Sequence, residues 1–297
     1  MRNRELGTSM VPLFKALRPQ QWIKNFFVLA ALLFSQHVLD PAYLLRSSTA
    51  FFCFCLISSA VYLFNDIQDL ENDRQHPEKR HRPIASGQIG IPLAGSTAAL
   101  FTLIALTLAF RLDVRFGAVI LIYGLQNLGY SIRLQHVAIL DVMIIATGFL
   151  LRAIGGAFAI DVEISSWFIL CTMLVALLFG FVKRRQELIL LEEGAPNHRR
   201  ILEEYTPQFL DQAISVLTAG ALVAYALYTM SPEVAQKLGT PYLNLTIPCV
   251  VYGLLRYLYL VYKKGEGGDP TSTLLQDSPL LITGVLWLAI LVTILYF

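Results

Sequence analysis

The sequence contains little charge for its length. Asp, Glu, Lys and Arg make up 15% of the 297 residues, whereas 56% are hydrophobic, and the mean hydropathy is +0.59. A soluble domain typically has about 25% charged residues and no more than about half apolar ones. The charged residues also lie in short clusters, separated by apolar stretches of roughly 20 residues, which is long enough to cross a bilayer core. These features exclude an ordinary soluble domain and predict an all-α membrane protein.

Cysteine and histidine are too scarce to indicate a disulfide framework or a metal site built from those residues. The five histidines show no metal-ligand spacing. The cysteines all fall within apolar stretches, where Cys behaves as a small hydrophobe; they are Cys53, Cys55, Cys171 and Cys249. The formal net charge of only +2 gives no reason to expect a nucleic acid partner. Residues 1–24 are polar and basic, so we expect the first apolar segment to stay in the mature chain.

Apolar stretches bounded by charged, Pro-rich or Gly-rich breaks predict about nine transmembrane helices. Their expected ranges are 24–39, 43–65, 91–110, 114–131, 137–159, 165–182, 210–231, 240–262 and 278–297. With the N-terminus in the cytoplasm, 17 of the 23 Lys and Arg residues fall on the cytoplasmic side. Only four fall on the other side, namely Arg46, Arg111, Arg115 and Lys237. Because positive charge favours the cytoplasmic side, this bias predicts a multi-pass protein of the inner (plasma) membrane with a cytoplasmic N-terminus.

Two of the basic residues lie inside predicted helices, where a charge is costly unless it faces a cavity or a partner. Arg152 lies within LLRAIGGAF, whose small residues permit close helix packing, and we expect it to face a polar cavity as a substrate-binding residue. Arg256 lies one to two turns from Lys263. It either extends towards the membrane interface or faces a partner inside the bundle.

Two long charged segments follow the second and the sixth predicted helices. They cover residues 66–90 and 183–209. Both open on the cytoplasmic side of the membrane, so we expect their side chains to converge on one active site within a single domain covering 1–297. The predicted extracytoplasmic loops are short and carry no comparable cluster.

The first charged segment begins with an acidic motif at the cytoplasmic end of the second predicted helix. Asp66, Asp69 and Asp73 stand at positions i, i+3 and i+7, which places their carboxylates on one face of a helix. Such close like charges repel unless a cation holds them, and Mg²⁺ is typically bound by one or two carboxylates together with substrate phosphate oxygens. The alternative is a solvated acidic helix end.

Basic residues follow the acidic motif directly. Lys79, Arg80 and Arg82 lie within ten residues of Asp73 and suit a ligand with more negative charge than a metal alone neutralises, such as a diphosphate. The alternative is that they are ordinary positive-inside anchors. Lys24, beside Trp22 near the first predicted helix, is a candidate for binding a lipid phosphate, although Trp and Lys also pair in interfacial belts.

The acidic motif resembles that of a known family. Residues 65–73 match the NDxxDxxxD motif of the UbiA superfamily of intramembrane prenyltransferases, and the following KRxRPIASG-type segment is similar too. The resemblance extends over essentially the whole chain and implies a UbiA-like helical bundle. It also implies that Asn65, Asp66, Asp69 and Asp73 bind Mg²⁺ bridged to a diphosphate.

The chain departs from most of that family after the sixth predicted helix. Members that use a prenyl diphosphate carry a second acidic DxxxD motif there, whereas this chain has Lys183, Arg184, Arg185, Gln186 and Glu187. A basic cluster cannot hold a second Mg²⁺ but can bind phosphate directly. Glu187 either orients Lys183 or contacts a ribose hydroxyl, or forms a simple i,i+4 ion pair.

The basic cluster and two further segments resemble the branch of the superfamily that transfers phosphoribose. The segments are LRPQQWIKN at 17–25 and YSIRL at 130–134, which contribute Tyr130 and Arg133 as substrate-binding candidates. The resemblance implies a Mg²⁺-dependent transfer of 5-phosphoribose from phosphoribosyl pyrophosphate to a polyprenyl phosphate, for synthesis of a cell-envelope pentose donor. Tyr205 and Asp211, which flank the start of the seventh predicted helix, are further candidates for reaching the site.

Two other functions remain open. One is transfer of a prenyl group from its diphosphate to an aromatic acceptor, and the other is lipid or anion transport. Lys183 and Arg184 count against the first, and the concentration of charge on one membrane face counts against the second. The partners we expect are the two substrates and membrane lipid; the sequence does not decide between a monomer and a homo-oligomer.

Overall fold

The computed structural model describes residues 11–77, 79–192, 200–265, 268, 273 and 275–297. Within these residues the chain forms helices and no strand, as an all-α protein should. The principal helices are η1 (Pro19–Leu29, 3-10), α2 (Ala30–Phe34), α3 (Pro41–Gln68), α4 (Leu70–Gln75), η2 (Lys79–His81, 3-10), α5 (Ile91–Leu112), α6 (Val114–Ile132), α7 (Leu140–Ile160), α8 (Ser166–Glu192), η4 (Arg200–Glu204, 3-10), α9 (Pro207–Met230), α10 (Pro232–Leu238), η5 (Tyr242–Thr246, 3-10), α11 (Ile247–Lys264) and α13 (Ser278–Tyr296).

Local sequence signals explain where several of these helices begin and end. Asp40 precedes α3 and Asp277 precedes α13, and each accepts a hydrogen bond from a backbone N–H of the first turn. Thr206 does the same before α9, and all three helices have proline in their first two positions. Gly239 and Gly265, with φ values of 72° and 66°, end α10 and α11 in the left-handed conformation that glycine tolerates.

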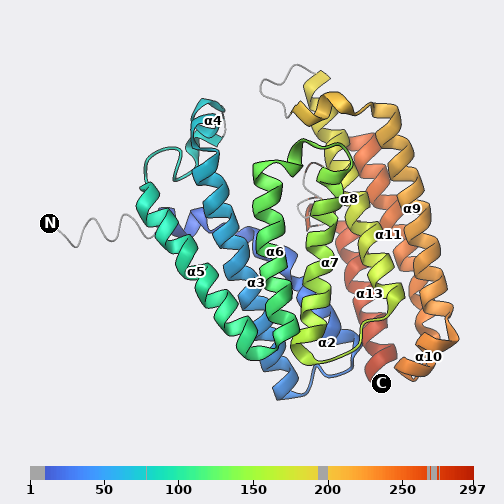
Figure 1. The fold of residues 1–297 in the computed structure, drawn as a ribbon. Helices are drawn as coiled ribbons and strands as arrows, with labels where there is room; N and C mark the ends of the chain where they lie inside the picture. The colour runs from blue at the N-terminus through green and yellow to red at the C-terminus, as the bar shows by residue number, and fades with distance from the viewer. Residues whose placement is uncertain (1–10, 78, 193–199, 266–267, 269–272, 274) are drawn as a thin grey trace. The chain divides into compact units, whose positions relative to one another are not determined.

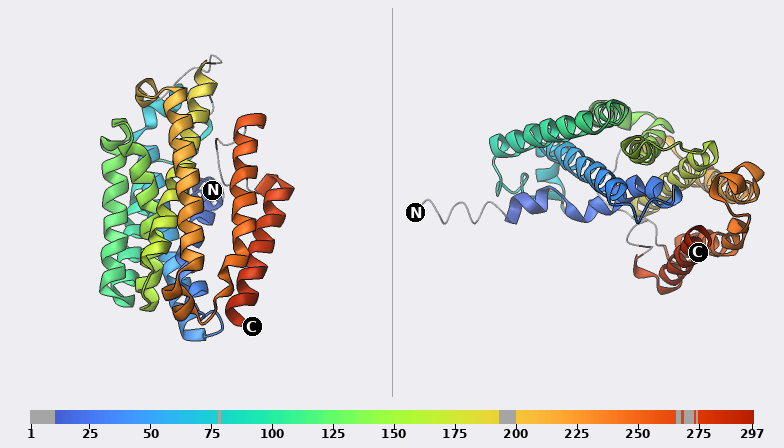
Figure 2. Two further views of the ribbon diagram at one scale, coloured as in Figure 1. Left: turned by 90° about the vertical axis from the view of Figure 1, so that its right-hand side faces the viewer. Right: turned by 90° about the horizontal axis from the view of Figure 1, so that it is seen from below.

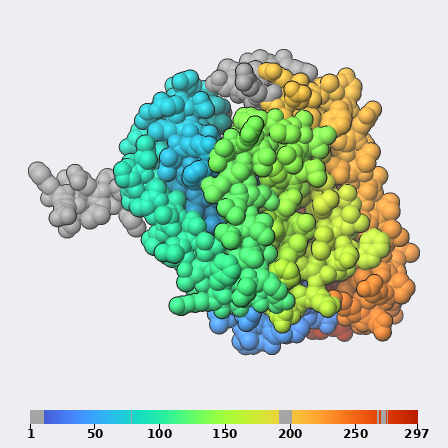
Figure 3. All heavy atoms as spheres, in the orientation of Figure 1, coloured from blue at the N-terminus to red at the C-terminus, as the bar shows by residue number. Residues whose placement is uncertain are grey.

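The chain divides into two compact units. Of the described residues, unit 1 contains 11–33, His37–Arg133 and Leu151–Glu163. Its helices α3, α5 and α6 lie side by side (Figure 1). Aromatic residues such as Phe54, Phe116 and Tyr123 form the centre of its apolar core. In the space-filling view of Figure 3, side chains of α5 and α6 cover one face of this unit.

Unit 2 contains Phe34–Gln36, Leu134–Leu150 and the described residues from Ile164 onward. Helices α8 and α9 pack together, and α11 packs against α13, as the left-hand view of Figure 2 shows in orange and red. The core of this unit includes Leu178, Val182, Leu210 and Tyr257. Helix α7 contributes its first half to unit 2 and its second half to unit 1.

Seven helices in the described part of the chain are long and apolar enough to cross a membrane. They are α3, α5, α7, α8, α9, α13 and the continuous segment Tyr242–Lys264. Two of the nine expected spans are outside this set. The range 24–39 contains part of the 3-10 helix η1 and the short α2, and the range 114–131 is the 19-residue α6, which carries Arg115, Gln126 and Asn127.

The structure also corrects two segment boundaries. Helix α8 continues to Glu192, so the basic cluster that begins at Lys183 lies on a helix instead of in a loop. At the first charged segment, α3 extends to Gln68 and α4 follows almost immediately, so the acidic motif is largely helical. Residues 193–199, within the second predicted loop, are outside the described residues.

Candidate functional site

The acidic motif of unit 1 spans the end of α3 and the start of α4. The backbone N–H of Asp69 donates to the carbonyl of Asn65, and that of Asp73 donates to the carbonyl of Asp69, both at 2.8 Å. Helical hydrogen bonding therefore continues through the interruption at Asp69. As a result, Asp66 and Asp73, two turns apart, share a face and are only 2% and 3% exposed.

Two arginines bind these buried carboxylates. Arg82 Nη1 lies 2.6 Å from Asp73 Oδ2 and 3.2 Å from Asp66 Oδ1, so one nitrogen bridges both acids. Arg18 Nη2 lies 2.5 Å from the same oxygen of Asp66, and its guanidinium also lies over the ring of Tyr62. Two buried negative charges are thus balanced by two guanidinium groups that remain partly exposed.

The third acid of the motif behaves differently. Asp69 is half-buried, and among the described residues no ion pair involves it. The described residues contain no group of three His, Cys, Asp or Glu side chains close enough to hold one metal ion. Of the three carboxylates, the structure therefore brings together those of Asp66 and Asp73.

The residues of the acidic motif nevertheless fit a divalent hard cation. Asp66 and Asp73 offer carboxylate oxygens, which are the ligands that Mg²⁺ prefers. The guanidinium nitrogen of Arg82 already lies within hydrogen-bonding distance of both, so their geometry accommodates positive charge between them.

A cavity of about 350 Å³ opens beside Asp66. Its polar lining comes from the segment before and at the start of η1 and from the residues that follow the acidic motif. These side chains are Lys15, Arg18, Gln20, Gln21, Asp66, His81 and Arg82. The cavity is therefore mostly basic, with one acidic wall. Small-molecule sites typically have volumes of about 300 Å³ or more.

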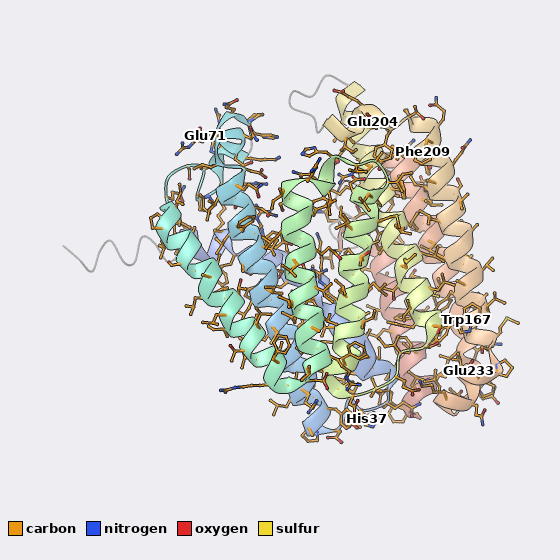
Figure 4. All side chains as sticks on the ribbon, viewed as in Figure 1. His37, Glu71, Trp167, Glu204, Phe209 and Glu233 are labelled. Atoms are coloured by element: carbon orange, nitrogen blue, oxygen red, sulfur yellow. The ribbon has the colours of Figure 1, made fainter. Side chains whose placement is uncertain are left out.

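The other predicted residues after the motif lie near it in the chain but are more exposed. Lys79 is half-buried in η2 and Arg80 is exposed, with its Nε 3.3 Å from His81 Nε2. Figure 4 shows Glu71 on α4, where it is exposed and forms an ion pair with Arg74. Arg82 thus contacts the acidic motif in the structure.

The end of α6 lies against the end of α3. Ser131 Oγ donates to Asn65 Oδ1 at 2.6 Å, which fixes the first residue of the acidic motif. Tyr130 beside it is half-buried, and Arg133 is exposed just after the helix ends. The structure thus places Ser131 of the YSIRL segment next to the acidic motif within unit 1.

Arg152 lies in the core of unit 1 and is not among the residues that line the cavity beside Asp66. It is 6% exposed; its Nε donates to Asn25 Oδ1 at 2.7 Å and its Nη2 donates to Tyr123 Oη at 2.8 Å. Its guanidinium also lies 4.8 Å from the centre of the Tyr123 ring. Polar groups from η1 and α6 therefore solvate this intramembrane charge. Lys24, the neighbour of Asn25 on η1, is half-buried.

In unit 2 the basic cluster of α8 contains a buried ion pair. Arg184 is 1% exposed, and its Nε donates to Asp141 Oδ2 at 2.6 Å. The Tyr205 hydroxyl donates to the other oxygen of Asp141 at 2.7 Å and accepts a hydrogen bond from the backbone N–H of Ile139. Burial, together with the hydrogen bond to Asp141, raises the pKa of Tyr205 above its usual range. Arg184 thus links α8 to the start of α7, a role that its sequence position did not indicate.

The remaining residues of this cluster also form contacts within unit 2. Glu187 pairs with Arg184 at i,i+3, a contact that was not among the alternatives considered from the sequence. Lys183 itself is half-buried. Arg185 Nε donates to Asp211 Oδ1 at 2.5 Å, and its guanidinium stacks on the ring of Tyr262. The start of α9 and the end of α11 are joined in this way.

Arg256 has a partner inside the protein. Its Nη2 lies 2.8 Å from Asp277 Oδ2 and its Nε 3.2 Å from Oδ1, which is a bidentate ion pair. These hydrogen bonds lower the pKa of Asp277. Of the two interpretations of this intramembrane charge, the partner is therefore the correct one.

Sequence reasoning missed three contributors. Arg18 is indicated by its sequence position only as a positive-inside residue, although it lies in the quoted LRPQQWIKN segment. Asp141 escapes notice because it is an isolated polar residue in an apolar stretch, and Asn25 because nothing in the quoted LRPQQWIKN segment indicates its partner Arg152. The rule that intramembrane charges seek partners could have identified Asp141, since it is an acid near the start of a predicted span.

The apolar helices define a multi-pass membrane protein with an acidic site at the end of one helix. A family model described as the UbiA prenyltransferase family matches residues 25–278. The chain belongs to this family.

Two curated relatives share the same name, decaprenyl-phosphate phosphoribosyltransferase. The protein from Mycolicibacterium smegmatis is 36% identical over 96% of this chain and 92% of its own length. The protein from Corynebacterium glutamicum is 32% identical over 96% of this chain and 86% of its own length. Among solved structures, a UbiA homologue from Archaeoglobus fulgidus bound to GPP and Mg²⁺ matches with a TM-score of 0.72 at 16% identity, covering 96% of this chain and 100% of that chain. This likeness concerns the fold.

Proposed function

We propose that the protein transfers 5-phosphoribose from phosphoribosyl pyrophosphate to a polyprenyl phosphate of the decaprenyl type, releasing diphosphate. The observation that carries the proposal is the basic end of α8, where Lys183, Arg184 and Arg185 replace a second acidic motif. Near full-length similarity to relatives named for this reaction supports the same conclusion.

The proposed donor site is the acidic motif and the basic cavity beside it. Asp66, Asp69 and Asp73 would hold Mg²⁺, which as a Lewis acid stabilises the departing diphosphate. The substrate-binding residues proposed from the sequence are Lys24, Asn65, Lys79, Arg80, Arg82, Tyr130, Arg133, Arg152, Lys183, Arg184 and Glu187. The buried contacts of Arg152 and Arg184 favour a positioning role for these two over direct contact with substrate.

The reaction asks the protein to bring two anionic substrates together. The lipid phosphate is already anionic at neutral pH, so its oxygen can attack the ribose carbon without a strong general base. The main task of the side chains is then to orient both substrates against their mutual repulsion and to exclude water. A cavity lined by Lys15, Arg18 and Arg82 meets this demand.

The proposal includes the arrangement in the membrane. Nine crossings, with η1–α2 and α6 added to the seven clearly apolar segments, place the N-terminus and the segments 66–90 and 183–209 in the cytoplasm. Phosphoribosyl pyrophosphate is a water-soluble substrate that reaches the site from the cytoplasm, whereas polyprenyl phosphate is a membrane lipid. A site at the cytoplasmic end of α3, in the inner membrane, can meet both.

A transfer assay tests the function directly. Purified protein with Mg²⁺ is incubated with labelled phosphoribosyl pyrophosphate and a polyprenyl phosphate, and label is measured in the lipid phase. We expect Mg²⁺-dependent transfer. Absence of transfer, combined with prenylation of an aromatic acid from a prenyl diphosphate, would select prenyl transfer instead.

A further inference from the structure

The charges at the acidic motif balance each other without any ligand. Asp66 and Asp73 are almost completely buried, and the guanidinium groups of Arg18 and Arg82 neutralise them. A divalent cation added to this arrangement would leave a net buried charge of about two, which is strongly unfavourable in a region shielded from water. The cation can bind well only if the guanidinium groups move away or if anions arrive with it.

The backbone of Arg18 indicates that its position is functional. Arg18 has φ 53° and ψ 58°, the left-handed conformation, immediately before Pro19. A residue other than glycine rarely adopts this conformation, and the residue before a proline is normally extended. Such strained residues persist where the surrounding structure over-determines them, often at ligand sites. Here the strain directs the side chain onto Asp66, on the wall of the basic cavity.

The cavity offers both guanidinium groups an alternative position, in which they can bind an anion. Arg18 and Arg82 line it together with Lys15, and both are partly exposed, so they can turn towards a bound anion with little movement. Guanidinium groups bind carboxylate and phosphate with the same forked geometry. An incoming diphosphate can therefore replace the carboxylates as their partner.

We infer that Arg18 and Arg82 are exchangeable counter-ions of the metal site. They hold Asp66 and Asp73 in the free protein, and they pass to the diphosphate when it arrives with the metal. The metal and the diphosphate therefore bind cooperatively, and each binds poorly alone. The inference rests on the proposed function only for the identity of the donor that carries the diphosphate.

Binding measurements on the purified full chain test this inference. Mn²⁺ is titrated in the absence of other ligands and its free concentration is followed by electron paramagnetic resonance. Arg18→Gln removes one of the two competing cations from Asp66, so we expect it to bind Mn²⁺ alone about tenfold more tightly than the unsubstituted protein. At saturating Mn²⁺, labelled inorganic pyrophosphate measured by equilibrium dialysis should bind about tenfold more weakly to the same variant. The two changes have opposite signs.

Arg74→Gln provides the matched control. Arg74 lies next to the acidic motif but pairs with exposed Glu71, so its removal changes the charge equally without freeing Asp66 or Asp73. We expect less than about a twofold change in either measurement. Unchanged or weaker Mn²⁺ binding in Arg18→Gln, or equal tightening in Arg74→Gln, overturns the inference. If Arg18→Gln does not yield folded protein, Arg82→Gln is measured with the same expectations. Phosphoribosyl transfer is assayed separately, so failure of the proposed function leaves the binding result interpretable.

Discussion

Asp69 and Glu71 lie two residues apart in the same acidic motif, yet their expected roles differ. Asp69 forms no ion pair within the described residues, so Asp69→Asn should leave the melting temperature nearly unchanged. If it contributes to metal binding, the same substitution lowers the Mg²⁺-dependent transfer rate by about 100-fold or more. Both quantities can be measured on one detergent-solubilised preparation. Glu71→Gln, which removes an exposed negative charge from the same motif, should keep near-normal activity; loss of activity in both variants would contradict the assignment.

Tyr205 predicts a pH dependence of stability. Its pKa is raised in the folded protein, whereas an unfolded tyrosine ionises near pH 10. The unfolded state therefore loses this proton before the folded state does, and the stabilisation from Tyr205 is present below about pH 10 and declines above it. We expect the difference in melting temperature between the unsubstituted protein and Tyr205→Phe to shrink between about pH 9 and 11. A difference that stays constant over this range would show that the hydroxyl does not remain protonated in the fold.

Residue contacts were predictable where they follow from local helical spacing. They were missed where the partner is distant in the sequence. The spacing of Asp66 and Asp73 correctly placed them on one face, because helical periodicity is a local property. Arg18 lies 48 residues from Asp66, and Arg184 lies 43 residues from Asp141. Such pairings arise from helix packing, which one sequence does not reveal. The arginines that pair with Asp66 and Asp73 were therefore only partly identified from the sequence, since Arg82 was a candidate and Arg18 was not.

At the scale of elements, the contact between η1 and α7 depends on one glycine. A Cβ atom on Gly156 would lie 1.9 Å from the carbonyl oxygen of Val28, which is a backbone atom and cannot turn away. Gly156→Ala should therefore destabilise unit 1 by about 3 kcal/mol through overpacking. Gly95→Ala on α5 is the control, because a Cβ added there would meet nothing within 4 Å and helix propensity favours alanine. Thermal unfolding in detergent compares the two variants, and equal melting temperatures would refute the close approach.

Helix α8 shows what periodicity could and could not predict about elements. Its apolar core was expected at 165–182, and the observed helix begins at Ser166. Its 27 residues correspond to about 40 Å, whereas a bilayer core is about 30 Å thick. The end of the apolar run therefore did not mark the end of the helix. Continuation to Glu192 depends on contacts such as Arg185 with Asp211, which the sequence pattern does not display.

At the scale of the whole molecule, the proposed topology can be tested by cysteine labelling. With nine crossings, Arg111 and Lys237 lie outside the cell membrane and Glu71 lies inside. A membrane-impermeant maleimide should therefore label Arg111→Cys and Lys237→Cys in intact cells, and Glu71→Cys only after permeabilisation. The four native cysteines are buried or half-buried, and the unsubstituted protein measures their background. Labelling of Glu71→Cys in intact cells would show that the orientation is opposite to the proposed one.

The fold class was predictable because hydropathy and charge distribution are properties of the whole sequence. The all-helical architecture and the family membership follow the expectation. Hydropathy did not predict in the same way whether the first and fourth expected spans cross the membrane. Polar residues such as Asn25 and Asn127 lower the hydropathy of these spans. In the structure Asn25 accepts a hydrogen bond from Arg152, and Asn127 donates one to the backbone carbonyl of Tyr123.

The nitrogen of Arg82 that lies between two buried acids has a consequence for when the protein is ready to work. Without Arg18 and Arg82, the carboxylates would bind Mg²⁺ whenever the cation is present, whether or not the diphosphate substrate is there. In the mechanism inferred above, these two arginines neutralise the acidic cluster instead. The cluster then binds the metal only when the diphosphate is present as well. The supply of activated sugar, and not the supply of metal, then sets the timing of each catalytic cycle.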